Sequence, residues 1–194
     1  MLSTTMIAKN YHFKAKPFLF DFLIKNNFII KKDSYELTSK GIKIGGKYHS
    51  NEKGEKWIVW DEKKFHNTIN FFKLEILKQY HIATIDHMIH IDNLDTILQY
   101  GLFSHNNPYK KIDISNKEVN SKRIKIEPIY HKSIHNYVPF YFNPRNAMLY
   151  RNQQVFGENI IILGFYNKII CKDNVIFTNS NAVAKSSIFT NDIT

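Results

Sequence analysis

The stretch "IDHMIHIDNLDTILQYGL" (Ile85–Leu102) decides the fold of the larger part of this chain. Its first half places Ile85, His87, Ile89 and Ile91 at every second position, the spacing of one face of a β-strand. Asp92 or Asn93 can then cap a short helix, "LDTILQY", which Gly101 ends in the usual C-terminal position. The sequence therefore predicts a strand that passes directly into a helix.

The same stretch contains two histidines that could suggest a metal site. His87 and His90 are three residues apart, so on a strand their side chains point to opposite faces and cannot chelate one ion. No third ligand follows at a familiar spacing, and Cys171 is the only cysteine, which excludes both an internal disulfide and a Cys-rich zinc site. We expect no metal, and a hydrogen-bonding role for each histidine.

Composition narrows the class of protein. A hydrophobic content of 43% with 14% aromatic residues is typical of a globular chain. No apolar run approaches the ~18 residues that span a bilayer, and the N-terminus lacks the apolar core of a signal peptide. We therefore expect a cytoplasmic protein with no membrane contact.

The chain is strongly basic, with a net charge of +10. Residues 1–79 contain 15 basic and 8 acidic side chains, and residues 80–194 contain 12 and 9. A positive excess suits a polyanionic partner, of which nucleic acid is the first candidate. The alternative is that a composition rich in Lys, Asn and Ile is basic without any such partner.

Residues 1–79 predict a small α+β module. A helix is expected over 16–27, a strand over 28–32, and a short helix capped by Thr38 or Ser39 and broken at Gly45. A hairpin over 46–60 and a connecting helix over 61–79 follow. This order is winged-helix-like, and such a module either contacts nucleic acid or serves as a scaffold.

The stretch "NYVPFYFNPRNAMLY" (Asn136–Tyr150) combines several aromatic rings with two prolines and one arginine. Rings on a loop can stack nucleic-acid bases. We interpret "VPFYF" as a core strand that Pro144 ends, after which "AMLY" returns to the core. Further along, "NIIILGF" (159–165) predicts a buried strand and "NVIFTN" (174–179) another. No phosphate-binding glycine motif is present.

Four blocks carry a resemblance to a known family. They are "HMIHIDNLDTILQYGLFSH" (His87–His105), "ISNKEVNSKR" (Ile114–Arg123), "IHNYVPFYFNPRNAMLY" (Ile134–Tyr150) and "FTNSNA" (Phe177–Ala182). In this order they resemble the DarT-type DNA ADP-ribosyltransferases, the toxins of DarT–DarG toxin–antitoxin systems. The resemblance covers roughly 80–194 and leaves the N-terminal module outside.

The resemblance implies a mixed α/β ADP-ribosyltransferase fold, with two packed sheets around an NAD cleft. It implies transfer of ADP-ribose from NAD, used as a substrate, to a base in single-stranded DNA. The "HMIH" block matches a family strand that usually reads His-Ile-Thr-His and grips NAD. His87, Met88 and Ile89 are thus the expected NAD contacts, with Asn93 opening the supporting helix. Ile89 replaces the usual threonine hydroxyl.

Arg123 matches the family's essential arginine, so the resemblance makes it a catalytic residue and an NAD contact. An arginine there can hold a pyrophosphate or favour the deprotonated form of the target base. Tyr141, Arg145 and Asn146 are the expected nucleic-acid contacts.

The family also implies a macrodomain antitoxin of the DarG type as a partner, and a catalytic glutamate on a later strand. Glu127 and Glu158 are the only glutamates after Glu118, and neither lies in the matching block. We therefore expect the domain over 80–194 to be truncated at its C-terminus, with impaired transfer. The alternative is a catalytically inactive nucleic-acid-binding remnant.

Overall fold

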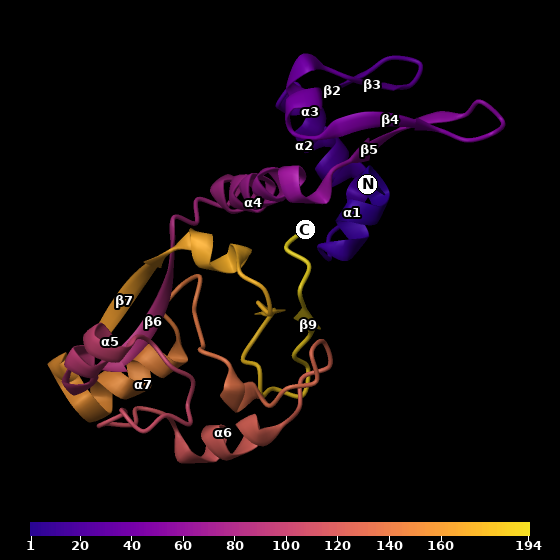
Figure 1. Cartoon of the computed structure of the whole chain (residues 1–194). Coiled ribbons are helices and arrows are strands. Elements are labelled where there is room, and N and C mark those ends of the chain that lie inside the picture. Colours follow the sequence, from indigo (N-terminus) through magenta and orange to yellow (C-terminus); the bar gives the residue numbers. More distant parts are fainter. The chain divides into compact units, whose positions relative to one another are not determined.

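The structure is a computed structural model that describes all residues, 1–194, and it consists of two compact units (Figure 1). Unit 1 comprises Met1–Tyr80 together with Asn191–Thr194, and unit 2 comprises His81–Thr190. The sequence-based division ended the second domain at Thr194, whereas the last four residues belong to unit 1. There Ile193 packs against the core, and the Thr194 hydroxyl accepts a hydrogen bond from the Lys14 backbone at 3.3 Å.

Unit 1 contains helices and short antiparallel strands. A three-stranded sheet has the order β1-β5-β4, and a second sheet is the hairpin β2–β3. A single wide turn at Ala15–Leu19 leads into the second helix. In chain order the elements are β1 (Leu2–Ser3), α1 (Thr4–Asn10), α2 (Phe20–Lys25), β2 (Ile29–Lys31), β3 (Tyr35–Leu37), α3 (Ser39–Lys43), β4 (Gly46–Ser50), β5 (Lys56–Trp60) and α4 (Glu62–Gln79).

Side-chain caps start three of the four α-helices of unit 1, α1, α3 and α4. The Ser3 oxygen accepts from the Met6 N–H at the start of α1, and the Thr38 oxygen accepts from the Gly41 N–H at the start of α3. Asp61 does the same for α4. Each cap satisfies a backbone donor that the helix leaves without an internal partner. The predicted cap at Thr38 is confirmed.

The core of unit 1 forms around one face of α4. Phe65, Ile69, Phe72 and Ile76 follow one another at three- and four-residue spacing, and all are buried. They pack with Trp60, whose indole N–H donates to the Thr4 hydroxyl at 2.9 Å, so the one polar atom of this buried ring is satisfied.

Three elements of unit 1 had no signal in the sequence: β1, α1 and β3. Strand β1 is only two residues long, and it exists because Leu2 and Ser3 pair with Trp60 and Val59 of β5. A pairing partner more than fifty residues away leaves no local pattern. The predicted hairpin and connecting helix are confirmed as β4–β5 and α4.

Unit 2 has longer loops and two two-stranded sheets, β6–β7 and β8–β9. One-turn 3-10 helices join several of its elements, including those at Lys122–Ile124 and Gly157–Asn159. The named elements are β6 (Thr84–His90), α5 (Leu94–Tyr100), α6 (Lys117–Ser121), α7 (Ala147–Phe156), β7 (Ile160–Tyr166), β8 (Phe177–Thr178) and β9 (Phe189–Thr190).

The predicted strand and helix over 85–101 are confirmed as β6 and α5, and Gly101 ends α5 with φ +90°. The capping prediction is wrong in its details. The Asn93 side chain makes no capping bond, and instead His90 Nδ1 accepts from the Asp92 N–H at 3.2 Å in the turn that precedes α5.

Three further predictions for unit 2 need correction. "VPFYF" is not a core strand, because only Tyr141 pairs, in one isolated bridge with Asp86. "AMLY" begins a helix, α7, whose first turn is capped by Asn146. The strand predicted at 159–165 is confirmed as β7, but its residues alternate between half-buried and exposed instead of being buried throughout. It pairs only with β6, so its outer edge and one face stay open.

Candidate active site

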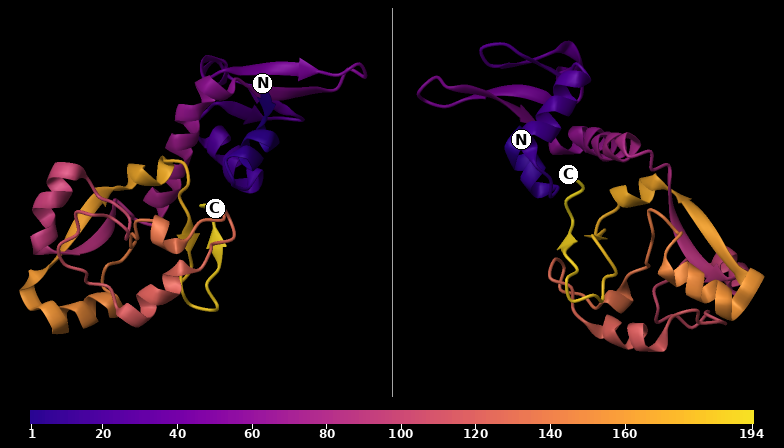
Figure 2. Two further views of the ribbon diagram at one scale, coloured as in Figure 1. Left: turned by 60° about the horizontal axis from the view of Figure 1, so that its bottom comes forward. Right: turned by 180° about the vertical axis from the view of Figure 1, so that it is seen from behind.

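Strand β6 is the centre of the candidate site. Its seven residues all pair with β7 on one edge. On the other edge, Asp86 and Tyr141 exchange two backbone hydrogen bonds of 2.8 and 2.9 Å. Helix α7 packs against one face of the β6–β7 strand pair (Figure 2). There the Phe156 ring contacts the His90 ring edge-on, and the Asn152 amide contacts the Met88 sulfur at 3.4 Å.

His87 lies on the opposite face of β6 from Met88, because side chains alternate along a strand. Its Nδ1 is 2.7 Å from the carbonyl oxygen of Pro139. A carbonyl can only accept, so Nδ1 carries the hydrogen. The ring also packs against Phe140, with the centroids 5.8 Å apart.

Burial lowers the pKa of His87 below its ordinary value. The hydrogen bond to Pro139 opposes this effect, and the positive charge of Arg123 adds to it. The ring is therefore neutral near pH 7, with Nδ1 as a donor. Its Nε2 consequently presents a lone pair that can accept a hydrogen bond, for example from a hydroxyl of a ligand.

Arg123 approaches Tyr141 as well as His87. Burial raises the pKa of Tyr141, and the charge and hydrogen bond of Arg123 oppose that rise. The phenol in turn donates to the Met148 sulfur at 3.0 Å. None of the ion pairs in the structure includes Arg123, which is half-buried. A guanidinium in this setting suits an anionic ligand such as a phosphate.

These interactions lead to a prediction about the titration of His87. As the pH falls, the unfolded chain takes up the histidine proton near pH 6.5, before the folded chain does. His87 therefore contributes stability above that pH, and the contribution is lost as the pH falls toward the folded pKa. An NMR titration of the ring carbon signal should give a pKa below 6.5, and Arg123→Met should move it upward.

Arg145→Met is the matched control, because Arg145 has no part in the lowered pKa of His87. Its removal should leave the titration of His87 where it is. A His87 pKa at or above the ordinary value, or an equal response to both arginine substitutions, would contradict the described geometry.

A short loop behind Arg123 holds its backbone. The Ser133 hydroxyl donates to the Arg123 carbonyl at 3.1 Å, and Ile126 pairs with Ser133. At the centre of the loop, the Glu127 carboxylate is only 1% exposed. It accepts hydrogen bonds from the backbone N–H groups of Ile129, Tyr130 and Lys132 and from the Tyr137 hydroxyl, at distances between 2.6 and 3.2 Å.

Two stacked histidines support the other side of the Arg123 segment. The rings of His105 and His135 are 4.6 Å apart at 21°. His135 Nε2 lies 2.9 Å from the carbonyl oxygen of Asn120 and must donate to it, while the Asn120 amide nitrogen lies 3.0 Å from His105 Nε2. Asn120 belongs to α6, immediately before the turn that carries Arg123. The network therefore sets where that turn lies.

A hollow of about 470 Å³ lies elsewhere in unit 2, beside α5. Its two aspartates outnumber its single cation, and that cation, Lys111, is bound to Asp95 at 2.6 Å. An anionic ligand would meet net negative charge there, so the Arg123 region suits a pyrophosphate better. The hollow is lined by Ile91, Asp92, Leu94, Asp95, Leu98 and Lys111.

A comparison with protein families identifies unit 2. The sequence model described as "ssDNA thymidine ADP-ribosyltransferase, DarT" matches residues 87–194, more than half of the chain. The chain belongs to the DarT family.

Individual relatives agree with this assignment. A DNA ADP-ribosyl transferase of Thermus sp. (strain 2.9) is 43% identical over 70 residues, which are 34% of this chain and 34% of the relative. A DNA ADP-ribosyl transferase–DNA ADP-ribosyl glycohydrolase fusion protein of Thermosipho africanus (strain H17ap60334) is 26% identical over 113 residues, 52% of this chain and 28% of the relative. The chain thus spans about a third of the length of these relatives.

A solved structure extends the comparison to the fold. The structure titled "Thermus sp. 2.9 DarT in complex with ADP-ribosylated ssDNA" superimposes with a TM-score of 0.51 at 31% identity. The match covers 57% of this chain and 59% of that one. The expected α+β ADP-ribosyltransferase fold is confirmed.

Within the DarT match, the residues expected from the sequence fall into two groups. His87, Arg123 and Tyr141 come from three separate blocks and meet in one region. Met88 and Ile89 are both buried in β6, Ile89 on the same face as His87 and Met88 on the face toward α7.

The other three expected site residues have different surroundings in the structure. The Asn93 amide oxygen accepts from the backbone of Lys111 and Ile112, so its side chain anchors a loop. Asn146 caps α7 with its side chain, and Arg145 is exposed.

Sequence reasoning missed the residues that hold the site together. His105 and His135 both lie in blocks that resemble DarT, yet nothing in their spacing indicates that the rings stack. Asn120 and Asn152 carry no sequence signal either. Asn152 is fully buried in α7, where its amide contacts Met88.

The chain contains neither a metal-ligand cluster nor a membrane-spanning helix. No group of three or more His, Cys, Asp or Glu side chains is arranged to hold a metal ion. No helix combines the length and the apolar character that crossing a bilayer requires.

Proposed function

We propose that unit 2 binds NAD and transfers its ADP-ribose to a base of single-stranded DNA. The observation that carries this proposal is the shared region of three residues from separate family blocks. Tyr141 pairs with Asp86, the neighbour of His87, and Arg123 hydrogen-bonds to Tyr141 and takes part in no ion pair. The match to the DarT family supports the choice of substrates.

Each residue has a role that follows from its chemistry. Arg123 supplies fixed N–H donors and a positive charge for the NAD pyrophosphate or for a base that is losing a proton. His87 accepts a hydrogen bond from a ribose hydroxyl through Nε2, and Ile89, on the same face of β6, forms the adjoining wall. Met88 lies on the other face of the strand, against α7. In the reaction, the bond between ribose C1′ and the nicotinamide nitrogen breaks, and C1′ bonds to a base nitrogen that releases its proton.

The target base in this proposal is thymine, the base of the nucleoside named in the family description. Thymine has one ring N–H, and a nearby cation favours the deprotonated, nucleophilic form of such a group. Tyr141 is the proposed nucleic-acid contact beside this cation, and its interaction with Arg123 supports that role. Arg145, which is exposed, and Asn146 remain proposed contacts at the edge of the site.

The biological role that fits this activity is that of a toxin controlled by a glycohydrolase antitoxin of the DarG type. The name of the Thermosipho africanus relative joins a transferase and a glycohydrolase in one chain, which supports such a pairing. The reaction would take place in the cytoplasm, where NAD and DNA are both present.

A second candidate function is binding without transfer, and one observation favours it. Neither glutamate after position 118 is aligned for catalysis by an interaction of the structure: the Glu127 carboxylate accepts hydrogen bonds from the loop around it, and Glu158 is exposed in the turn after α7. In this reading the chain binds NAD or single-stranded DNA, and transfer is impaired.

One experiment separates the two candidates. The full chain is incubated with NAD and single-stranded oligonucleotides that contain or lack thymidine, and released nicotinamide and the oligonucleotide mass are measured. A gain of one ADP-ribose unit only on the thymidine oligonucleotide, lost in Arg123→Ala, supports transfer. Binding of NAD or DNA without nicotinamide release supports the second candidate, and absence of both binding and transfer contradicts both.

A further inference from the structure

The β4–β5 hairpin of unit 1 carries an exposed face that the family match does not cover. His49 and Trp57 are directly paired across the hairpin, and Lys47 lies two residues from His49 on the same face. All three side chains are exposed. The hairpin lies outside residues 87–194, so nothing in the proposed transfer reaction accounts for this face.

The hairpin is firmly built although its outer half is exposed. At its base, Ile58 and Trp60 are buried in the core of unit 1. At its tip, the Asn51 side chain accepts from the backbone of Lys53 and of Glu55, and Gly54 adopts φ +77°. These contacts fix the conformation of the hairpin at both ends. Figures 1 and 2 show the hairpin extending from the helices of unit 1.

The exposed indole is held in place and not buried. Trp57 is 38% exposed, whereas Trp60, three residues along the same strand, is fully buried. The His49 ring contacts Trp57 edge-on, with centroids 4.9 Å apart at 70°. A large aromatic ring is thus partly exposed beside a lysine, and sequence-tolerant nucleic-acid binders combine these two residue types to stack bases and hold phosphates.

The charges around this face favour an anionic partner. Neither Lys47 nor Lys53 takes part in any ion pair of the structure. Both acidic residues of the hairpin, Glu52 and Glu55, lie in its turn, and the Glu55 carboxylate accepts from the Asn51 amide at 2.6 Å. Residues 1–80 as a whole carry fifteen lysines against eight acidic side chains.

We propose that the hairpin face formed by Lys47, His49 and Trp57 binds single-stranded nucleic acid. A base stacks on the Trp57 indole, and backbone phosphates contact Lys47 and, at the tip, Lys53. An unstacked base is needed because paired bases in a duplex do not expose their faces. The site holds the strand and takes no part in chemistry, so it is independent of NAD.

Tryptophan fluorescence tests this proposal directly in the full chain. The protein has two tryptophans, and only Trp57 is exposed. Titration with an unlabelled thymidine oligonucleotide should quench the emission, and Trp57→Phe should abolish the quenching while the oligonucleotide still binds. Trp57→Ala should weaken binding, followed by fluorescence anisotropy of a labelled oligonucleotide, roughly 5- to 150-fold, the effect of losing one stacked base.

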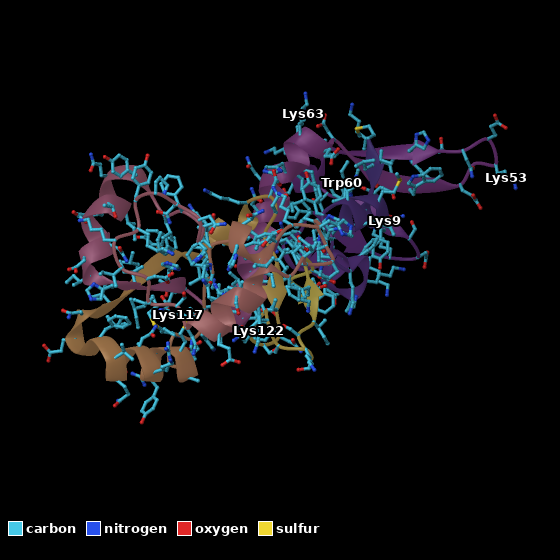
Figure 3. All side chains as sticks on the ribbon, turned by 90° about the horizontal axis from the view of Figure 1, so that it is seen from below. Lys9, Lys53, Trp60, Lys63, Lys117 and Lys122 are labelled. Atoms are coloured by element: carbon cyan, nitrogen blue, oxygen red, sulfur yellow. The ribbon has the colours of Figure 1, made fainter.

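Lysine pairs provide a matched control for charge. One double variant, Lys47→Gln with Lys53→Gln, removes two positive charges from the hairpin. The control, Lys9→Gln with Lys63→Gln, removes two positive charges from α1 and α4 of the same unit; Figure 3 labels Lys9, Lys53 and Lys63. The hairpin pair should lower the slope of log affinity against log salt by roughly 1.4, since each phosphate contact to a single strand contributes about 0.7. The Lys9 and Lys63 pair should leave the slope nearly unchanged.

Three results would overturn the proposal. The first is that the oligonucleotide does not quench Trp57 fluorescence, and the second is that both lysine pairs change the salt slope equally. The third is that heparin binds as tightly as the oligonucleotide and that Trp57→Ala changes neither affinity. The last would indicate attraction of any polyanion. Arg123→Ala should keep the quenching intact. Failure of ADP-ribose transfer with normal quenching would therefore count against the proposed function alone.

Discussion

Arg123→Ala is expected to weaken NAD binding by about 10- to 150-fold and to abolish any ADP-ribose transfer. The range corresponds to the loss of about 1.5–3 kcal/mol, the contribution of a hydrogen bond that involves a charged group. The effect should be large because Arg123 is half-buried and has no carboxylate partner, so its donors are available to a ligand. Isothermal titration calorimetry with NAD measures the affinity.

Two controls show whether the position and the shape of the cation both matter. Arg123→Lys keeps the charge but loses the planar pair of donors, so it should recover only part of the affinity. Arg145→Ala removes an exposed arginine outside the cluster and should change NAD affinity less than about threefold. Unchanged NAD affinity in Arg123→Ala would remove Arg123 from the proposed site.

Glu127→Gln is expected to open the loop behind Arg123. The carboxylate accepts from three backbone N–H groups and one hydroxyl, and an amide of the same shape has one oxygen and turns an NH₂ group toward some of these donors. Buried donors left without partners cost about 1–3 kcal/mol each. We therefore expect the local free energy of opening of this loop to fall by roughly 3 kcal/mol. Its amide hydrogens should then exchange about a hundredfold faster.

Hydrogen exchange followed by mass spectrometry is the suitable measurement, because both tryptophans belong to unit 1 and their fluorescence does not report on this loop. Peptides over 124–137 should exchange faster in Glu127→Gln, and peptides from α4 should not. Glu158→Gln, a substitution at an exposed glutamate, is the matched control and should leave both unchanged. Equal protection of the loop in all three proteins would refute a structural role for Glu127.

The same carboxylate makes the loop sensitive to acid. Burial alone would raise the pKa of Glu127, but the hydrogen bonds from Lys132, Tyr130 and Tyr137 outweigh it and lower the pKa below its ordinary value. The stability that it contributes is therefore present above the ordinary glutamate pKa and is lost as the pH falls through the folded pKa. In Glu127→Gln this acid-dependent loss of protection should be absent.

Local patterns predicted much of the secondary structure, and they failed where pairing is non-local. The cap of α3, the helical pattern of α4 and the stop of α5 at Gly101 are readable because a helix closes its hydrogen bonds within four residues. The apolar run at 159–165 indicated a strand, but burial depends on what packs on each face, and β7 proved half-exposed. "VPFYF" has the residue types of a strand, yet it forms only the bridge of Tyr141 with Asp86.

By itself, the sequence was enough to indicate the family, because four ordered blocks of residue types are a property of the chain and need no coordinates. It also determined the basic character of residues 1–80. Only the tertiary structure decided which block residues share a region. Arg123 interacts with both His87 and Tyr141. In contrast, the Asn93 side chain hydrogen-bonds to the backbone of a loop, and the Asn146 side chain caps α7. The physical reason is that the meeting depends on the loop around Glu127 and on the His105–His135 stack, contacts between segments far apart in the chain.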